Sequence, residues 1–324
     1  MKIFFLLNYL NRFIKSSFEN IMKNIFKIST LPVMVLSLLC ITPSSSEDLK
    51  NKLKSEKDRM IHDVTHKFNS NLESFLSKNF ETSEVSLSSG TTNEVVGNIL
   101  VVKPLSDVNN KNTTTFAQGS IFLSDDSRET INLGIGTRKL TNDDTLMLGA
   151  NLFYDYEFEY DHQRASLGLE AKTSVGEITF NEYLGFSGWK TGFQDKSEKA
   201  LNGSDLEFGA PLPYLPWTNF YYRSFKWEGA SGNADQKGDD ISLEAKMPSG
   251  LNLEIGKRSF DDTTEDEEFV RVTWTCCNND DDETFGVSDT AYNLTSVENK
   301  RFAKVRRENL IVKQKGMNLS VIGF

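Results

Sequence analysis

Between residues 130 and 190, large apolar residues alternate with glycine, small polar residues or charged residues. One run sets Ile131, Leu133 and Ile135 against Asn132, Gly134 and Gly136, and another sets Ala165, Leu167 and Leu169 against Ser166, Gly168 and Glu170. A repeat of two is typical of a strand with one apolar and one polar face, because successive side chains point to opposite sides. A helix would not tolerate so many glycines at this spacing. The chain is therefore predicted to be all-β.

The alternation alone fits two kinds of β protein. A soluble sandwich buries its apolar faces, whereas a membrane barrel turns them to lipid and encloses a wet lumen. The net charge of −10 superficially favours a soluble protein, but every second residue of a membrane barrel also faces water. After Thr42, no run supplies the roughly 20 apolar residues of a membrane helix. The acidic balance, without a basic patch, argues against a nucleic-acid partner.

Twelve strands are expected before residue 276. They lie near Glu84–Ser88, Gly97–Lys103, Thr114–Leu123, Thr130–Arg138, Thr145–Glu157, Arg164–Thr173, Glu177–Trp189, Ser204–Pro211, Trp217–Trp227, Asp239–Met247, Leu251–Phe260 and Glu268–Thr275. Most are close to the roughly 9–11 residues that a tilted strand needs to cross a bilayer. An even number of antiparallel strands closes into a barrel and leaves no unpaired edge in lipid.

The connections between these strands are predicted to be sorted by length. Residues 140–144, 174–176 and 248–250 form short connections, and the intervening ones, such as 191–203 and 228–238, are mostly longer. Membrane barrels place short turns at the periplasm and long loops outside, whereas a sandwich has no reason for such sorting. The lengths therefore favour a twelve-stranded antiparallel transmembrane β-barrel.

Several spaced motifs resemble one known family. Residues 148–161 read Leu-Gly-Ala-Asn-Leu-Phe-Tyr-Asp-Tyr-Glu-Phe-Glu-Tyr-Asp and are followed by His162 and Arg164. Ser-Gly-Trp at 187–189, Asn-Gly-Ser-Asp-Leu at 202–206, Pro-Leu-Pro at 211–213 and Arg-Arg-Glu-Asn-Leu-Ile-Val at 306–312 follow in order. Together, from about residue 81 to 315, they resemble the β-domain of inverse autotransporters, the intimin and invasin family.

This resemblance implies a bacterial outer-membrane barrel that anchors and exports its own C-terminal segment at the cell surface. It implies outer-membrane lipid, the barrel-assembly machinery and periplasmic chaperones as partners, and a host-surface or passenger partner outside. It implies no enzyme and no cofactor. No run of immunoglobulin-like strands follows the barrel, so we expect a barrel without a passenger adhesin. The alternative is a stand-alone porin-like or surface-ligand barrel whose passenger is lost.

The region before the barrel is predicted to have two parts. Residues 1–46 are interpreted as a signal peptide, because Lys23 and Lys27 precede an apolar core and serines at 44–46 offer a cleavage site. Met22 is an alternative start. Residues 47–80 lack Gly and Pro and repeat apolar residues mostly at every fourth position, which indicates an amphipathic helix in the place of the family's periplasmic segment. It is a spacer, or its apolar stripe forms a homodimer.

The barrel itself, residues 81–275, carries two further predicted sets. The residues expected to face the lumen are Arg138, Glu170, Glu244 and Glu254. The residues expected in aromatic girdles at the membrane interfaces are Tyr154, Tyr156, Trp217 and Trp227.

The remaining residues, 276–324, are predicted to be a linker and plug. A chain that enters from the periplasm leaves an even-stranded barrel on the same side, and in the family this segment threads back through the lumen. Its basic stretch contains the plug candidates Lys300, Arg301, Lys304, Arg306 and Arg307. Carboxylates in the lumen would attract these cations where water is confined. Because Arg138 and Lys172 also face the lumen, we expect orientation rather than tight binding, from about Tyr292 to Val312.

Catalytic and metal chemistry have little support in the sequence. His62 and His66 lie four residues apart, but no third soft ligand accompanies them. His162 follows Asp161 in an outer loop, as in the family's non-catalytic signature. Acidic runs at 261–268 and 280–283 do not have the spacing of a calcium loop, and we interpret them as solvated loops.

Overall fold

The computed structural model describes residues 76–91, 95–124, 128–192, 195–247, 250–262, 264–276 and 286–316. The predicted signal peptide lies outside the described residues, as does the predicted helical segment except its last five residues. Within the described part, residues 76–79 form a helical turn. No helix there is long and apolar enough to cross a membrane.

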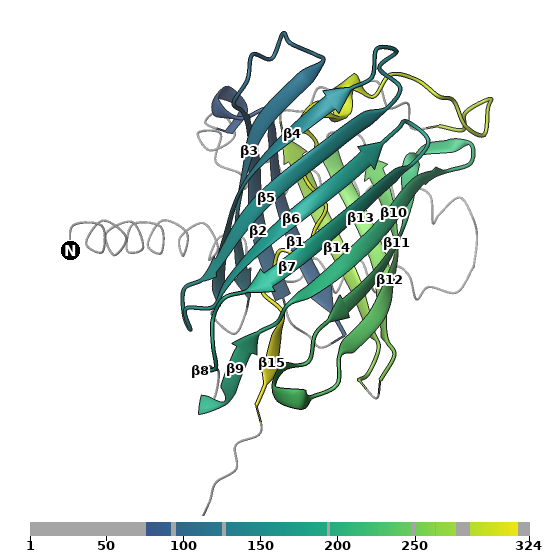
Figure 1. Ribbon diagram of the computed structural model, residues 1–324. Helices are drawn as coiled ribbons and strands as arrows, with labels where there is room; N and C mark the ends of the chain where they lie inside the picture. Colours follow the sequence, from purple (N-terminus) through teal and green to yellow (C-terminus); the bar gives the residue numbers. More distant parts are fainter. Residues whose placement is uncertain are drawn as a thin grey trace, which may run out of the picture. The chain divides into compact units, whose positions relative to one another are not determined.

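Twelve antiparallel strands close into a barrel (Figure 1). The strands are β1 (Thr82–Gly90), β2 (Val95–Pro104), β3 (Thr113–Ser124), β4 (Glu129–Leu140), β5 (Met147–Glu157), β6 (Gln163–Lys172), β7 (Glu177–Gly185), β10 (Gly203–Leu212), β11 (Leu215–Trp227), β12 (Gln236–Met247), β13 (Leu251–Phe260) and β14 (Glu267–Cys276). The pairing of β1 with β14, which sets Val85 opposite Trp274, closes the circle. The predicted fold class is confirmed.

A small second sheet, which the sequence did not predict, lies at one end of the barrel (Figure 1). Its strands run in the order β15 (Lys313–Lys315), β9 (Ser197–Ala200) and β8 (Lys190–Thr191). Two short 3-10 helices complete the described elements, η2 (Ala230–Gly232) and η4 (Glu298–Phe302). Because β8 and β9 come from the connection between β7 and β10, this sheet joins a barrel loop to the C-terminal region.

The two ends of the barrel differ, and we call the end where β1 begins the entry rim and the opposite end the far rim. The entry rim carries connections 105–112, 141–146, 173–176, 213–214 and 248–250. The far rim carries 91–94, 125–128, 158–162, 186–202, 228–235 and 261–266. The predicted sorting by length therefore holds only for the second half of the barrel. In the first half, 105–112 is longer than its far-rim neighbours, and its carbonyls accept hydrogen bonds from Arg301.

The alternation places apolar and polar side chains on opposite faces of the wall. Leu133, Leu167 and Leu169 point outward and remain 56%, 55% and 52% exposed. Asn132 and Glu170, their neighbours in sequence, point inward and are buried. An apolar outer face and a polar interior are what a bilayer requires, because lipid does not solvate polar side chains.

The aromatic residues divide between the two faces. Tyr154 is 43% exposed on the outer wall, and Tyr156 on the same face donates a hydrogen bond to Asp161. Trp217 is partly buried, and its indole donates to the carbonyl of Gly286. The prediction of a girdle position for Trp227 is wrong. Its side chain is buried inside the barrel against Tyr183, with ring centroids 5.1 Å apart, because β11 turns the face that carries Trp227 inward.

We expect Leu169→Arg to lower the free energy of unfolding by about 2–4 kcal/mol, because it places a charge in lipid. Leu169→Met at the same position should stay close to the wild type. Urea unfolding in lipid vesicles, followed by tryptophan fluorescence, measures the difference. Equal stability of the two variants would contradict the outward assignment of this face.

Candidate functional site in the barrel lumen

The C-terminal region runs along the entry rim before it turns into the barrel. Ser288 donates its backbone N–H to the carbonyl of Tyr214 at 2.8 Å, beside the β10–β11 turn. Thr295 donates to the hydroxyl of Ser174 at 2.8 Å, and Val297 donates to the carbonyl of Asp144 at 2.8 Å. The region thus passes three successive turns of the rim, at β10–β11, β6–β7 and β4–β5. It enters the lumen at η4, later in the chain than the predicted start near residue 292.

At the entry, Arg301 and Arg138 hold the backbone of η4. Arg301 donates to the carbonyl of Val108 at 3.2 Å, in the long 105–112 connection. Arg138 is 1% exposed and donates to the carbonyls of Arg301 and Ala303 at 2.8 and 2.7 Å. The same guanidinium pairs with Glu170. Arg138 and Glu170, both predicted to face the lumen, therefore fix the point at which the chain turns inward.

Two cations of the threading segment, which we define as residues 303–312, meet carboxylates in the middle of the lumen. Lys304 Nζ lies 2.7 Å from a carboxylate oxygen of Glu84. Arg306 pairs with Glu207, and its guanidinium lies 3.5 Å from the ring centroid of Tyr221. These contacts connect the segment to β1, β10 and β11, which come from both halves of the barrel.

Arg306 is also close to the two predicted lumen carboxylates. Its guanidinium nitrogens lie 3.6 Å from Glu244 and 4.0 Å from Glu254. Glu254 pairs more closely with Arg271, at 2.7 Å, and accepts a hydrogen bond from Ser242. Glu244 and Glu254 therefore contribute negative potential around Arg306, while Glu207 is its hydrogen-bonding partner.

A fully buried ion pair of the lumen joins Arg307 to Asp155. Two guanidinium nitrogens of Arg307 lie 2.9 and 2.7 Å from the two carboxylate oxygens of Asp155, whose exposure is 0%. Arg164 donates to the same carboxylate at 2.8 Å and to the carbonyls of Glu308 and Leu310 at 2.7 and 2.9 Å. A bidentate pair has a fixed geometry and is stronger than a single hydrogen bond. These contacts hold Arg307 in one orientation in the lumen.

The next residue, Glu308, is negatively charged, and its partners on the wall are arginines. Its carboxylate lies 3.3 Å from Arg223 and 3.5 Å from Arg258. Its backbone N–H donates to the hydroxyl of Tyr183 at 2.7 Å. Both signs of charge on the segment are thus matched by the wall.

Val305 is one of the apolar side chains of the segment that pack against the wall. Val305 is 1% exposed and lies in a buried cluster with Leu100, Val102, Phe116 and Phe153. Its backbone N–H donates to the side-chain carbonyl of Gln118 at 2.8 Å. Gly134 and Gly136 on β4 make room for these inward rings, since a Cβ at either position would lie under 2.5 Å from Phe153 or Phe116.

The far rim holds the end of the segment in a group of contacts that we call the latch. β15 pairs with β9, and Lys313 pairs with Glu157. Arg128 donates to both carboxylate oxygens of Glu198 at 2.9 Å. Burial alone would raise the pKa of Glu198, but the hydrogen bonds and charge of Arg128, together with the charge of Lys313, hold that pKa below its ordinary value.

His162 lies beneath the latch. Its Nδ1 lies 3.0 Å from the hydroxyl of Ser187, and its Nε2 lies 3.8 Å from Glu198. Burial, assisted by Lys313, lowers the pKa of His162 to about 4, despite the opposing charge of Glu198. The imidazole is therefore neutral at pH 7 and adds no charge to the group.

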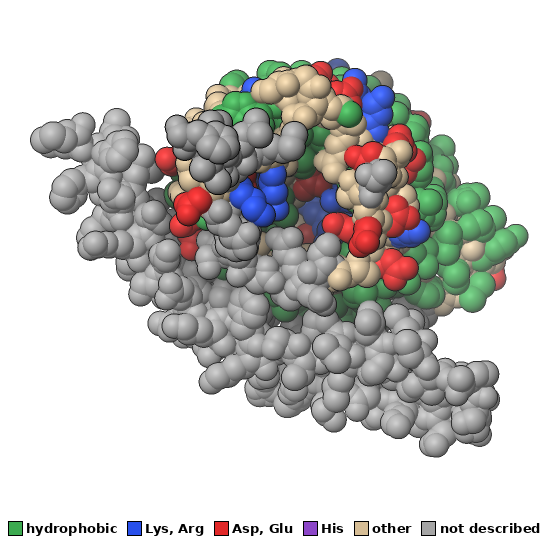
Figure 2. All heavy atoms as spheres, turned by 90° about the horizontal axis from the view of Figure 1, so that it is seen from below, with side chains coloured by type: hydrophobic (Ala, Val, Ile, Leu, Met, Phe, Trp, Pro, Cys, Tyr) green, Lys and Arg blue, Asp and Glu red, His purple; other side chains and the backbone are tan. Residues whose placement is uncertain are grey.

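The segment leaves part of the lumen unfilled beside β1 and β11–β14. Two spaces of about 270 and 390 Å³ lie there, and both are lined by Glu84, Tyr221, Lys304 and Arg306. Seen from the far rim, charged side chains of both signs line a hollow (Figure 2). Within the described part of the chain, no group of His, Cys, Asp and Glu could hold a metal ion.

The strongest partners of the segment were not named from the sequence. Glu84, Asp155, Arg164, Glu207 and Gln118 each occupy an inward position of their strand. Alternate residues of a strand point to the same side of the sheet. The alternation therefore predicts that all five side chains point inward, although it does not predict what each one contacts. Their individual pairing with the segment required the three-dimensional structure.

Comparisons with known proteins agree with the barrel fold. Residues 40–309 match the family model described as inverse autotransporter, beta-domain. Invasin of Yersinia enterocolitica is 36% identical over 93 residues, which cover 28% of this chain and 11% of that protein. The inverse autotransporter adhesin YeeJ of Escherichia coli strain K12 is 31% identical over 140 residues, which cover 42% of this chain and 6% of that protein. The chain thus matches only a small share of the length of these relatives.

Among solved structures, a chain from the study "Unveiling the Mechanism Behind the in-meso Crystallization of Membrane Proteins" has a TM-score of 0.61. It is 22% identical in sequence, and the match covers 73% of this chain and 100% of that one. This likeness supports the barrel fold.

We expect Asp155→Asn to destabilise the protein by about 3–5 kcal/mol, because two buried guanidinium groups lose their charged partner. Asp239→Asn on the outer face of β12 serves as the matched control and should have a small effect. Denaturant unfolding in micelles compares the two variants. A small loss for Asp155→Asn would mean that this carboxylate does not hold the segment.

The latch should weaken as the pH falls. Below about 6.5 the unfolded histidine binds a proton that the folded one, with a pKa of about 4, does not. The stability of the closed latch therefore falls as the pH drops from 6.5 to 4. Above pH 6.5 the titration of His162 does not change that stability. Hydrogen exchange at the amides of β9 and β15 should show falling protection over this range. His162→Gln should remove most of this dependence, and an unchanged profile in that variant would contradict the assignment.

Proposed function

Because the chain belongs to the inverse autotransporter β-domain family, we propose that its outer-membrane barrel exports and displays the C-terminal region of the same chain. The entry rim is the periplasmic end in this proposal, and the far rim faces the cell exterior. From residue 286 the chain runs along the entry rim, crosses the lumen as the threading segment and emerges beside β9.

The observation that carries the proposal is the continuous path of residues 303–316 through the barrel. It begins at Arg138 on the entry rim and ends in the β9–β15 pairing on the far rim. Wall residues contact it along the whole path, through Glu84, Asp155 and Glu157 among others. A tail left in the periplasm would make none of these contacts.

The charges of the lumen wall are complementary to those of this segment. Residues 300–315 contain seven Lys or Arg and one Glu. The inward carboxylates of β1, β5 and β10 face these cations, and the inward arginines of β11 and β13 face the glutamate. Ion pairs in confined water are stronger than on an open surface, but they exchange with water as a chain moves past. The same wall can therefore guide the segment during export and hold it afterwards.

The display function extends to partners outside the cell. The relatives are named an invasin and an adhesin. By that analogy, the region beyond the latch would meet a host surface or carry a passenger. Assembly would require the barrel-assembly machinery and periplasmic chaperones, as for other outer-membrane barrels.

We propose no catalytic role for this barrel. His162 and Ser187 contact each other, but both are buried, at 0% and 7% exposure. A nucleophile must reach its substrate, and these two groups lie buried beneath the latch. The family is one of adhesion and secretion barrels, in agreement with this proposal.

A porin-like barrel is the second candidate, and the unfilled lumen favours it. The two spaces of about 270 and 390 Å³ give small ions room beside the segment. The pairs Lys304–Glu84 and Arg306–Glu207 lie between them. Free conduction would require these pairs to separate, so we rank this function second.

Deletion of residues 286–324 should raise the ion conductance of the barrel in planar bilayers several-fold, because the plug is removed. An epitope tag placed after Phe324 should bind antibody on intact cells. Heat-modifiable gel migration serves as the control that the truncated barrel is folded. Unchanged conductance of the folded truncation, with a tag detected only after permeabilisation, would support a periplasmic tail instead.

A further inference from the structure

The outer wall of the barrel carries an apolar groove of about 590 Å³ over β2–β6. Its floor consists of small residues, Ala117 and Gly119 on β3 and Ala165 on β6, and Leu133 and Tyr154 form part of its sides. Gly119 lies opposite Leu133 in the β3–β4 register, and Leu133 lies opposite Tyr154. The groove is thus a depression in the surface that already faces the acyl chains of the membrane.

Gly119 has no role in the packing of the barrel that would explain its lack of a side chain. A Cβ built at this position would have its nearest contact at 3.7 Å, with Leu133, which is ordinary van der Waals distance. By contrast, Gly134 and Gly136 clear space for rings inside the barrel. The space above Gly119 therefore belongs to whatever contacts the outer wall.

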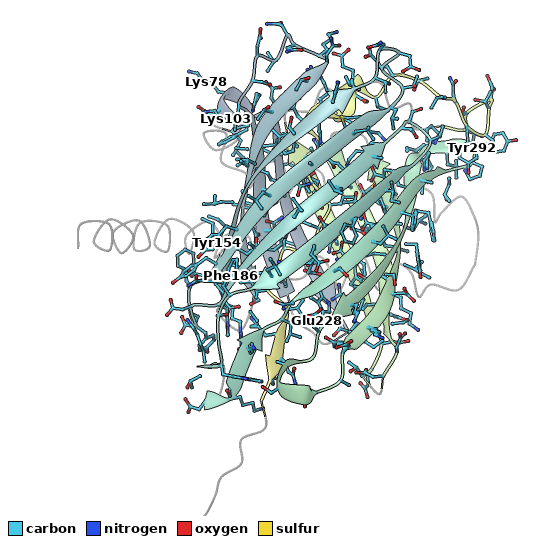
Figure 3. The ribbon with its side chains drawn as sticks, in the orientation of Figure 1. Lys78, Lys103, Tyr154, Phe186, Glu228 and Tyr292 are labelled. Carbon is cyan, nitrogen blue, oxygen red and sulfur yellow. The ribbon has the colours of Figure 1, made fainter. Side chains whose placement is uncertain are left out.

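Two lysines mark the end of the groove near the entry rim. Lys103 on β2 lines the groove itself and points outward. Lys78 lies on the helical turn before β1, and the backbone N–H of Glu81 donates to the carbonyl of Val102 at 3.1 Å, which brings this stretch beside β2. Figure 3 shows Lys78 and Lys103 near one edge of the barrel, with Tyr154 farther along the same edge.

Neither lysine makes an ion pair or hydrogen bond with the residues that the structure describes. Glu81 is the neighbouring carboxylate, so Lys78, Glu81 and Lys103 together carry one net positive charge. Two cations that have no partner among the described residues, beside an apolar depression near the entry rim, are complementary to an anionic lipid.

We propose that this groove is a binding site for an anionic phospholipid of the membrane leaflet at the entry rim. One acyl chain lies over Gly119 between Leu133 and Tyr154, and the phosphate and anionic headgroup meet Lys103 and Lys78. The inference rests on the membrane location of the barrel and not on export, so it stands or fails independently of the proposed function.

The test uses the full chain in vesicles of phosphatidylcholine with a minor fraction of phosphatidylglycerol, followed by detergent extraction and native mass spectrometry. The wild type should retain phosphatidylglycerol in preference to phosphatidylcholine. Gly119→Leu, which fills the groove, should lose about tenfold in retention of either lipid, and Lys78→Gln with Lys103→Gln should lose about tenfold for phosphatidylglycerol alone.

Lys139→Gln is the matched control, because Lys139 is an exposed lysine on β4 near the same rim that does not line the groove. It should retain phosphatidylglycerol as the wild type does. Heat-modifiable migration shows that each variant is folded. Equal retention of both lipids by the wild type, an equal loss in Lys139→Gln, or full retention by Gly119→Leu would each overturn the site. Occupation of the groove by protein, shown by cross-linking from Gly119→Cys to residues 47–75 instead of to lipid, would overturn it as well.

Discussion

The interior of this barrel is charged, and its charges are matched by a segment of the same chain. A twelve-stranded wall with arginines, aspartates and glutamates turned inward encloses more space than its own side chains fill. Buried charges without partners cost several kcal/mol each, so the lumen must contain water, ions or an opposing chain. The threading segment supplies that chain, with a cation or an anion at each level where the wall carries the opposite charge.

This arrangement links stability to transport. Arg307 sits with Arg164 on Asp155, and this pair is dry and bidentate. Lys304 and Arg306 face the wetter side of the lumen, where space remains. A segment held by one dry anchor and several wetter pairs is stable at rest, yet its wetter contacts can be replaced by water one at a time. The latch at the far rim then stabilises the threaded end through β9 and β15.

The sequence predicted what depends on local periodicity. The alternation around Leu133 and Asn132 defined both faces of β4, and the spaced motifs defined the family. Periodicity could not say that Arg306 meets Glu207, because the two are far apart in sequence and only closure of the barrel brings them together. Trp227 was misplaced since aromatic residues are common both at interfaces and inside a lumen. Trp227 lies an even number of positions from Tyr221 and Arg223 on the same strand, so its side chain points into the barrel as theirs do. β9 and β15 were missed because strands of four and three residues show too few alternations.

A charge-swap cycle between Lys304 and Glu84 tests the central claim most directly, namely that residues 303–312 occupy the lumen. Lys304→Glu and Glu84→Lys should each raise the frequency of open-channel events in planar bilayers, because each sets two like charges within about 3 Å. The double variant restores an opposite pair and should return the frequency toward that of the wild type, with a coupling of at least about 0.5 kcal/mol. Additive effects of the two substitutions, without recovery in the double variant, would contradict a threaded lumen.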